Sequence, residues 1–254
     1  MTKKILTKLF VILATIVIIQ LIFFISPLNN YFLPSPFEVI LAGFEVIISG
    51  ELIVHIIPSI YRILIGFLIA AFFGILLGLL LGITKKLDYI IEPLIEILRP
   101  IPPIAWIPIA ILIFGLGDGS AFFIVFLGAF FPIFTNTIFG VKKLPKKYIN
   151  LSKTLEISKI SFFKNILFKF TQPYIFTGLK IGIGMAWMSV IAAELIGAQS
   201  GLGYFIQINR LLLHTDKIVV GMIAIGILGF TLTKSIILIE KRLVKWELKN
   251  HVDD

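Results

Sequence analysis

The sequence contains no cysteine, and only 15% of its 254 residues are charged. Without cysteine there is no disulfide framework, thiolate nucleophile or cysteine-ligated metal. The three histidines, His55, His214 and His251, are scattered and show no metal-ligand spacing. Soluble globular domains carry about 25% charged residues. A chain this poor in charge is therefore not expected to be a soluble globular protein.

Motifs for nucleotide binding and hydrolysis are missing as well. No segment has the G-x-x-x-x-G-K-[ST] pattern of a phosphate-binding loop, so we do not expect the chain to hydrolyse ATP itself. The segment GLGYFIQ, which begins at Gly201, lacks the third glycine of a dinucleotide fingerprint. The segment GAQSG, which ends at Gly201, lacks the first glycine of a hydrolase elbow. We predict no catalytic residue, metal or cofactor, and thus no enzyme.

Long apolar segments dominate what is present. Hydrophobic residues make up 58% of the chain, and its mean hydropathy is +1.05. A membrane-spanning helix needs about 20 apolar residues and satisfies its own backbone hydrogen bonds. The sequence therefore predicts an all-α polytopic membrane protein with six spans: Leu9–Ser26, Ile63–Ile83, Ile101–Leu116, Ser120–Val141, Ile175–Gly197 and Ile218–Ile239. The first run is longer than a signal-peptide core of about 7–15 residues, so we interpret it as a retained signal anchor.

The net charge of +9 is distributed unevenly over the connections between these spans. Four segments on one predicted side (1–8, 84–100, 142–174 and 240–254) contain 18 lysines and arginines. Three segments on the other side (27–58, 117–119 and 198–217) contain two. Cytoplasmic loops carry this excess of basic residues. We therefore expect both termini and segment 142–174 in the cytoplasm, and we attribute the basic charge to membrane orientation rather than to nucleic-acid binding.

The third predicted span begins irregularly. Prolines occupy positions 100, 102, 103 and 108, and proline cannot donate a helical backbone hydrogen bond. Irregular backbone at membrane depth is tolerated where it is packed in protein or lines a polar cavity. Two interpretations remain open: a distorted helix end at the membrane interface, or an element that lines a pathway.

Segment 142–174 is too polar to cross a bilayer, yet it contains two amphipathic stripes. The first stripe consists of Tyr148, Leu151 and Leu155, and the second of Phe163, Ile166, Leu167 and Phe170. Between them, TLEIS at 154–158 predicts a break or a short helix. Taken alone, two such helices suit a position flat among lipid headgroups, with their lysines against anionic lipid.

This segment also resembles the EAA loop of the permease subunits of bacterial ABC importers. In the branch that carries sulfonates, taurine, nitrate and some vitamin precursors, the loop reads A-A-x-T-L-G-A-S, then F-x-x-[IV]-x-L-P and P-x-I-x-x-G-L. The positions that match are Thr154, Leu155, Ser158, Phe163, Ile166 and PYIFTGL at 173–179. The departures are Leu151 and Ser152 for the alanine pair, Glu156 for the glycine and Lys169 for the proline.

The resemblance extends over nearly the whole chain. It includes LPSP at 33–36, RPIPPIAWIPIAILIFGLGDG at 99–119, AAELIGAQSGLGY at 192–204, TDKIVVGMIAIGILG at 215–229 and IEKRLVKW at 239–246. It implies a type I ABC importer permease domain over 33–246, after an anchor and outer linker (1–32) and before a cytoplasmic tail (247–254). It further implies the bacterial plasma membrane, a cytosolic ABC ATPase subunit, an extracytoplasmic solute-binding protein and a second copy of the chain.

In that family, a short coupling helix in the loop docks in a groove on the ATPase. The residues that take this role by resemblance are Leu151, Thr154, Leu155, Glu156 and Ser158. Glycine permits backbone angles that glutamate resists. We expect Glu156 to adopt an ordinary helical conformation, because docking needs a rigid helix rather than one special angle.

Candidates for the translocation pathway are the polar residues inside the spans, Asn136, Trp187, Ser189 and Glu194. Glu194 is expensive at membrane depth, so it should face protein or water. Its two possible roles are a hydrogen bond to a neighbouring helix and a lining of the pathway. The other three could equally join helices to one another, and the small-residue pairs Gly74/Gly78 and Gly178/Gly182 suit close helix packing.

The function predicted from these observations is that of a permease subunit that moves a small solute by alternating access. The alternative is an ion-gradient-driven secondary transporter or channel, which the intramembrane carboxylate of Glu194 favours. A membrane-embedded enzyme is disfavoured, because the sequence lacks a nucleophile–base or metal-binding set of residues. The sequence does not identify the solute.

Overall fold

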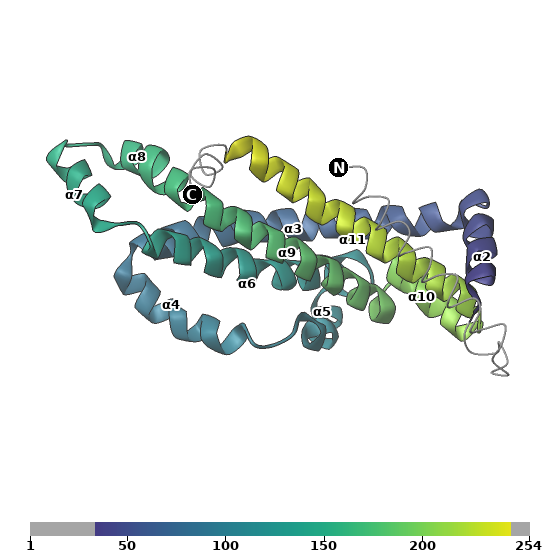
Figure 1. Ribbon diagram of the computed structural model, residues 1–254. Coiled ribbons are helices and arrows are strands. Elements are labelled where there is room, and N and C mark those ends of the chain that lie inside the picture. Colours follow the sequence, from purple (N-terminus) through teal and green to yellow (C-terminus); the bar gives the residue numbers. More distant parts are fainter. Residues whose placement is uncertain (1–33, 245–254) are drawn as a thin grey trace, which may run out of the picture.

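The computed structural model describes residues 34–244, which form an all-helical protein (Figure 1). The first predicted span, Leu9–Ser26, and the predicted tail, 247–254, lie outside the described residues. The elements are α2 (Pro36–Ile48), α3 (Glu51–Ile83), α4 (Lys85–Leu98), the 3-10 helix η1 (Pro103–Trp106), α5 (Ile107–Phe114), α6 (Asp118–Lys142), α7 (Lys146–Thr154), α8 (Lys159–Phe162), the π-helical turn η2 (Phe163–Leu167), α9 (Phe168–Gly197), α10 (Leu202–Leu211) and α11 (Thr215–Leu243).

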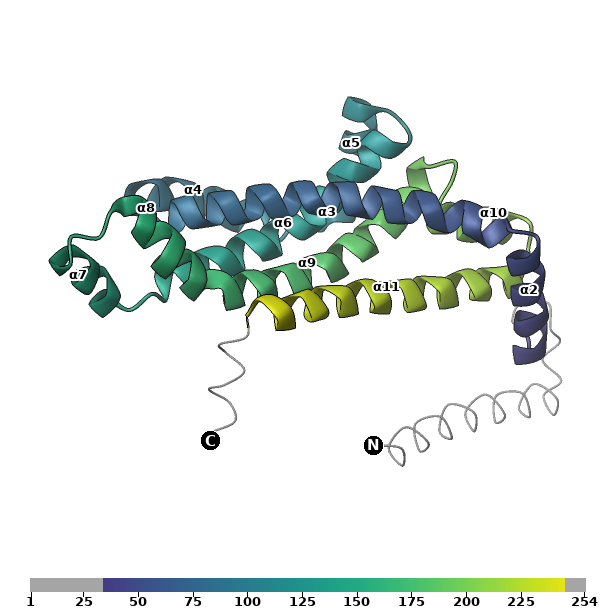
Figure 2. The same cartoon turned by 90° about the horizontal axis from the view of Figure 1, so that it is seen from above.

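Three long helices form the centre of the molecule. α6 packs along both α3 and α9, and α11 runs along α9 on the side away from α3 (Figures 1 and 2). Glycines allow the close approach of these helices: a Cβ added to Gly78 would lie 2.7 Å from Cβ of Thr137, and one on Gly182 would lie 2.9 Å from Cγ1 of Ile133. The predicted use of small residues for helix packing is confirmed.

Within residues 34–244, four helices are long and apolar enough to cross a membrane: α3, α6, α11 and the continuous run Lys159–Gly197 that ends with α9. The pair formed by α4 and η1–α5 adds a fifth crossing if it is counted as one broken span. The predicted all-helical membrane architecture is thus present. The number of six spans is not reached by the described residues.

α3 begins 12 residues before the predicted second span, Ile63–Ile83. The prediction starts after Arg62 because a charge is costly inside a span. In the structure Arg62 is 3% exposed and forms ion pairs with Asp118 and Glu194, so the helix continues through it. The preceding helix α2 was not predicted; Ser35 of LPSP caps it, and its N–H donates to Oε2 of Glu38 at 2.7 Å.

The third predicted span, Ile101–Leu116, differs most from the structure. Its regular α-helix is the eight-residue α5, and η1 precedes it. The prolines and Gly115, with φ of +77°, account for the short length. Segment 84–100, predicted to be a connection, instead forms α4. The helix axis bends by 88° between α4 and the unit made of η1 and α5.

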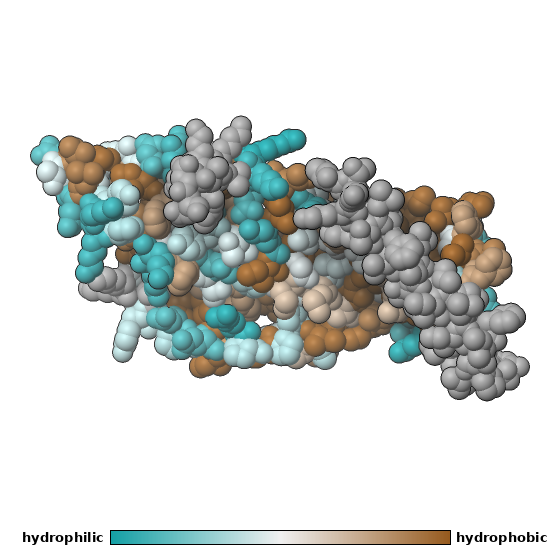
Figure 3. Space-filling view, viewed as in Figure 1, coloured by the Kyte–Doolittle hydropathy of each residue, from teal (hydrophilic) through white to brown (hydrophobic). Residues whose placement is uncertain are grey.

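The fourth and sixth predicted spans match α6 and α11 closely. α9 begins seven residues before the predicted fifth span, which was expected to start at Ile175. The amphipathic stripe before it continues through η2 directly into α9, so no loop separates them. Figure 3 shows hydrophilic residues gathered over the end of the molecule that carries α4, α7 and α8.

Candidate functional site

The first candidate site is the projecting segment, residues 146–162, which comprises α7, α8 and the break between them. It extends beyond the ends of α3 and α6, opposite the end that carries α2 and α10 (Figures 1 and 2). Its apolar residues Leu151, Leu155 and Ile160 are 54%, 61% and 82% exposed. By contrast, Ser152 is buried, and its hydroxyl donates to the carbonyl of Ile149 at 2.7 Å. The projecting segment therefore presents apolar side chains that nothing in the described chain covers.

Residues 163–170 follow the projecting segment, form its base and are anchored in the bundle. Leu167 is 2% exposed and belongs to a core cluster with Leu79, Val141 and Leu144. Phe163 and Ile166 pack against the same cluster, while Lys164 and Lys169 remain exposed. The predicted second stripe is therefore confirmed as a packed face. It joins the projecting segment to α3, α6 and α9.

The break in the projecting segment lies where TLEIS predicted one. α7 ends in a Schellman motif: the N–H of Ile157 donates to the carbonyl of Ser152 at 2.9 Å, and that of Glu156 donates to the carbonyl of Lys153 at 3.1 Å. Ser158 then caps α8 by accepting from the N–H of Ser161 at 3.3 Å. Thr154 is exposed, and its hydroxyl donates to the carbonyl of Asn150.

The expectation for Glu156 is wrong. Its φ is +51°, so it adopts the left-handed conformation rather than an ordinary helical one. The residue after the C-cap of a Schellman motif takes this conformation, which is why glycine is favoured there. Glutamate keeps the turn and bears a cost of about 1–2 kcal/mol for its Cβ.

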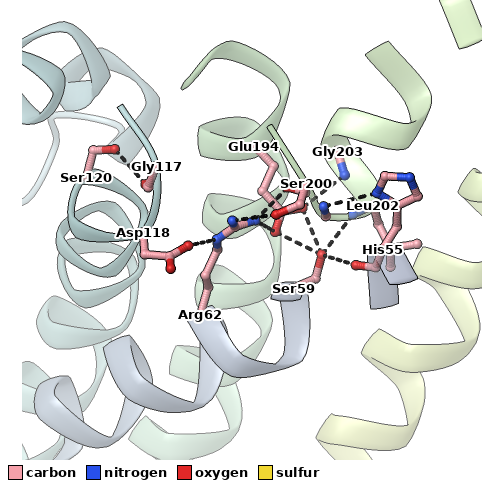
Figure 4. Close-up of polar contacts among 11 residues, drawn as sticks. His55, Ser59, Arg62, Gly117, Asp118, Ser120, Glu194, Ser200, Leu202 and Gly203 are labelled. Carbon is pink, nitrogen blue, oxygen red and sulfur yellow. Dashed lines mark hydrogen bonds and ion pairs between the residues drawn. The ribbon is translucent and has the colours of Figure 1, made fainter. Parts of the chain in front are cut away.

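A second candidate site is a buried polar network at the opposite end of α3 (Figure 4). Arg62 donates from Nε to Asp118 Oδ1 at 2.7 Å and from Nη1 to Glu194 Oε1 at 2.9 Å. Its remaining hydrogen bonds go to Ser200, whose carbonyl lies 2.6 Å from Nη1 and whose hydroxyl lies 2.9 Å from Nη2. One side chain of α3 thus holds α6, α9 and the segment before α10 together.

Glu194 is fully buried and its carboxylate is well supplied with donors. The Ser59 hydroxyl lies 2.8 Å from both carboxylate oxygens, and the N–H of Gly203 donates to Oε2 at 3.0 Å. A Cβ on Gly201 would overlap this carboxylate, and one on Gly203 would lie 2.7 Å from Cβ of Glu194. The glycines of GLGYFIQ therefore allow the backbone to approach a buried carboxylate.

The structure does not bring the four predicted pathway residues together. Trp187 and Ser189 are 7% and 5% exposed; the Trp187 indole N–H donates to the Ile225 carbonyl of α11 at 3.0 Å, and Ser189 lies against Gly128 of α6. Like Glu194, they make contacts between helices, which was the alternative to a pathway-lining role for each of these residues. A role in the pathway stays a prediction for them. Asn136 lies elsewhere, at a cavity.

Two adjacent cavities lie between α4, η1, α6 and α9. The first cavity, of about 220 Å³, is lined by apolar residues of α3, α4 and α6 and by the polar residues Glu92, Glu96, Arg99, Thr135 and Lys142. The second cavity, of about 240 Å³, is lined by Arg99, Ile101, Pro103, Leu127, Gly128, Phe131, Pro132, Thr135, Asn136, Ile181 and Met185. Irregular backbone at Ile101 and Pro103 thus lines a cavity that contains polar groups, as the pathway-lining interpretation requires.

Sequence reasoning missed Arg62, Ser59 and Arg99. A signal for Arg62 was available: it adjoins a long apolar run, and Asp118 and Glu194 are isolated acids in other apolar segments. Oppositely charged residues that are each isolated in apolar sequence are candidates to pair, because an unpaired charge in a membrane is expensive. Arg99 gives no such signal, because it lies in segment 84–100, which the sequence predicts to be a connection.

Taken together, the long apolar helices and the projecting amphipathic segment define a helical, multi-pass membrane protein. Residues 70–247 match the family model of binding-protein-dependent transport system inner membrane components. The chain belongs to this family, and the resemblance to ABC importer permeases is confirmed.

Individual proteins agree with this assignment. The chain is 37% identical over 228 residues to a nitrate import permease protein of Synechocystis sp., covering 85% of this chain and 82% of that protein. It is 32% identical over 237 residues to the taurine transport system permease protein of Escherichia coli K12, covering 91% and 84%. A solved chain of the MetNI methionine ABC transporter, in an inward-facing conformation, shares the fold with a TM-score of 0.58 at 18% identity, over 73% of this chain and 93% of that chain.

Proposed function

We propose that this chain forms half of the membrane pathway of an ATP-driven importer for a small solute. The solute class that its relatives suggest is nitrate, a sulfonate or taurine, with vitamin precursors of the same branch as further candidates. A separate cytosolic ABC ATPase supplies the energy, an extracytoplasmic binding protein delivers the solute, and a second copy of the chain completes the pathway. Symmetric pairing of two half-channels is the usual way to close such an assembly.

The observation that carries this proposal is the projecting segment with its exposed apolar surface and buried base. Leu151, Leu155 and Ile160 offer an uncovered patch, flanked by Lys153 and Lys159. Apolar residues that protrude from a polar region of a protein mark a binding surface. A groove on the ATPase would bind this surface. We name it the coupling surface, and it includes Leu151, Thr154, Leu155, Glu156 and Ser158.

The mechanism follows from the anchoring. Closure of an ATPase pair would draw two projecting segments together, and each base packs through Leu167 on Leu79 of α3 and Val141 of α6. Movement of the base would rotate these helices as a rigid unit and expose the pathway alternately to the two sides of the membrane. The excess of basic residues near the projecting segment supports a cytoplasmic location for it and for both termini, in the plasma membrane of a bacterium.

The test is the variant Leu155→Asp, measured for solute uptake and for retention of the ATPase during purification. We expect uptake and ATPase retention to be lost while expression and membrane insertion remain normal, because a charge enters an apolar contact without disturbing the buried base. The matched control is Leu211→Asp on α10, a leucine that is 66% exposed at the other end of the molecule. Normal uptake by Leu155→Asp would rule out the assigned contact. Uptake that persists without any ATPase, driven by an ion gradient, would favour the secondary transporter instead.

A further inference from the structure

Arg99 occupies an unusual position for an arginine. It follows α4 directly, at the bend that leads into the proline-rich backbone before η1, and it lines both cavities. Within the described part of the chain its guanidinium makes no hydrogen bond and no ion pair. The other arginine beside a long apolar segment, Arg62, has four such contacts.

Arg99 is exposed, and the second cavity places it level with Thr135 of α6. Thr135, which lines the cavity with Arg99, lies seven residues from the end of α6 at Lys142, or about 10 Å along the helix axis. A charged side chain at membrane depth is costly unless it meets water or an opposite charge. Arg99 therefore needs an anionic or aqueous partner from outside the described chain.

The neighbouring polar groups show what kind of partner the second cavity would hold. Asn136 donates one amide N–H to the carbonyl of Pro132 at 2.8 Å, which leaves its second N–H for a ligand. The Thr135 hydroxyl donates to the carbonyl of Phe131 at 2.8 Å and is not free to donate again. No carboxylate lines the second cavity among the described residues. The second cavity thus offers one free amide donor beside acceptor oxygens of Asn136 and Thr135, and Arg99 supplies its positive charge.

The carboxylates of this region line the first cavity, not the second. Glu92 there lies 3.5 Å from Nζ of Lys142, and Glu96 lines the same cavity. Arg99 and Thr135 are the residues that line both cavities.

We infer that Arg99 and the free amide N–H of Asn136 form a binding subsite for a small oxyanion in the second cavity. A guanidinium presents parallel N–H donors that bind planar or trigonal oxygen pairs in a bidentate manner. The cavity of about 240 Å³ holds a group of a few heavy atoms together with water. This inference deepens the proposed function, on which it rests for the identity of the transported solute: it favours nitrate and sulfonates over uncharged vitamin precursors.

The absence of cysteine allows a direct test in membrane vesicles that contain the full chain. Met185 lines the second cavity and is 37% exposed, so Met185→Cys places one thiol there. Its reaction rate is measured with two methanethiosulfonate reagents, one that carries a sulfonate and one that carries a trimethylammonium group. We expect the ratio of the sulfonate rate to the ammonium rate to fall about tenfold or more when Arg99→Gln is added, because a charged cleft concentrates the opposite charge. Arg99→Lys should preserve most of the ratio.

Controls and a second variant keep the result interpretable. Leu211→Cys, far from the cavity, should show the same rate ratio whether position 99 is arginine or glutamine. Asn136→Asp places a negative charge in the cavity with Arg99 intact, and it should lower the ratio even if Arg99→Gln fails to reach the membrane. Sodium nitrate or taurine should slow the reaction of the sulfonate reagent with the thiol of the Met185→Cys variant when Arg99 is present, and not with glutamine in its place.

The inference is overturned if the ratio changes less than twofold in both charge variants. It is also overturned if nitrate and taurine give no protection while anionic lipid does, because the partner of Arg99 would then be a lipid headgroup. These measurements need neither ATP nor the ATPase. Failure of the wild-type complex to carry out ATP-driven uptake would therefore refute the proposed function and leave the subsite to its own test.

Discussion

Removing Arg62 should destabilise the chain strongly, because it would strand a buried carboxylate. Glu194 has no exposed surface, and Arg62 is its cationic partner at 2.9 Å. In Arg62→Met the carboxylate keeps the hydrogen bonds from Ser59 and Gly203 but loses its countercharge. Breaking a buried ion pair in this way costs about 3–5 kcal/mol.

Asp118, the other acidic partner of Arg62, contributes much less to this cost. The side chain of Asp118 is 53% exposed, so water can solvate it when Arg62 is gone. Asp118→Asn should therefore cost at most about 1 kcal/mol, the upper end for exposed pairs. It serves as the matched control, since it removes an ion pair of the same arginine without burying a charge.

The assay is thermal unfolding of the purified chain in detergent, followed by helical circular dichroism. With about 2–4 °C per kcal/mol for a chain of this size, Arg62→Met should lower the apparent Tm by about 6–20 °C. Replacing Glu194 by glutamine in the same chain should recover most of the loss, because no buried charge is then left unpaired. Losses from Arg62→Met and Glu194→Gln that simply add, to within about 0.5 kcal/mol, would refute an energetic coupling between the two residues.

Three further substitutions test particular contacts. Glu156→Gly should relieve about 1 kcal/mol of left-handed strain, raising the hydrogen-exchange protection of the Ile157 amide about fivefold; unchanged protection would contradict the strain. Gly201→Ala should destabilise the chain by at least about 2 kcal/mol, since the Cβ overlaps the Glu194 carboxylate at a φ of +109°. Gly184→Ala, where the Cβ meets open space, is its control and should be neutral or slightly stabilising in the same thermal assay. Trp187→Phe should cost about 1 kcal/mol through the lost hydrogen bond to Ile225, and an unchanged Tm would exclude that contribution.

Much of the helical architecture was predictable, because uninterrupted apolar runs identify α6 and α11 within a few residues. Errors arose where a charge or a proline changed the pattern. Arg62 shortened the predicted second span because its partners, Asp118 and Glu194, are remote in sequence. Hydropathy cannot show that a charge is neutralised by a distant one.

The prediction of the α4–α5 region was wrong for a related reason. α4 contains lysines and glutamates, which hydropathy assigns to a loop, and its partner η1–α5 is broken by prolines. Neither half has the sequence of a regular span by itself; the 88° bend between them is a property of the fold. Consequently Arg99, which the bend places at the cavities, could not be recognised as a candidate site from sequence.

The projecting segment shows the opposite case. The two stripes of segment 142–174 and the break between them were predicted from periodicity, and the structure separates an exposed stripe at Leu151 and Leu155, in the projecting segment, from a buried one at Leu167, in its base. The left-handed conformation of Glu156 was missed because glutamate rarely adopts it. The Schellman hydrogen bonds fix the position of the turn. That position determines φ of residue 156 more strongly than the preference of glutamate does.

The coupling surface can be tested most directly with one thiol, at Leu155→Cys, in a chain that otherwise has none. A short bifunctional thiol–amine reagent added to inside-out membrane vesicles should join residue 155 to a nucleotide-hydrolysing subunit, and Leu211→Cys should give no such product. Two results would contradict the docking of an ATPase on the projecting segment as the source of movement. One is labelling of the thiol at position 155 by a membrane-impermeant reagent from the outer face of intact cells, and the other is its failure to join any ATPase in vesicles that transport solute.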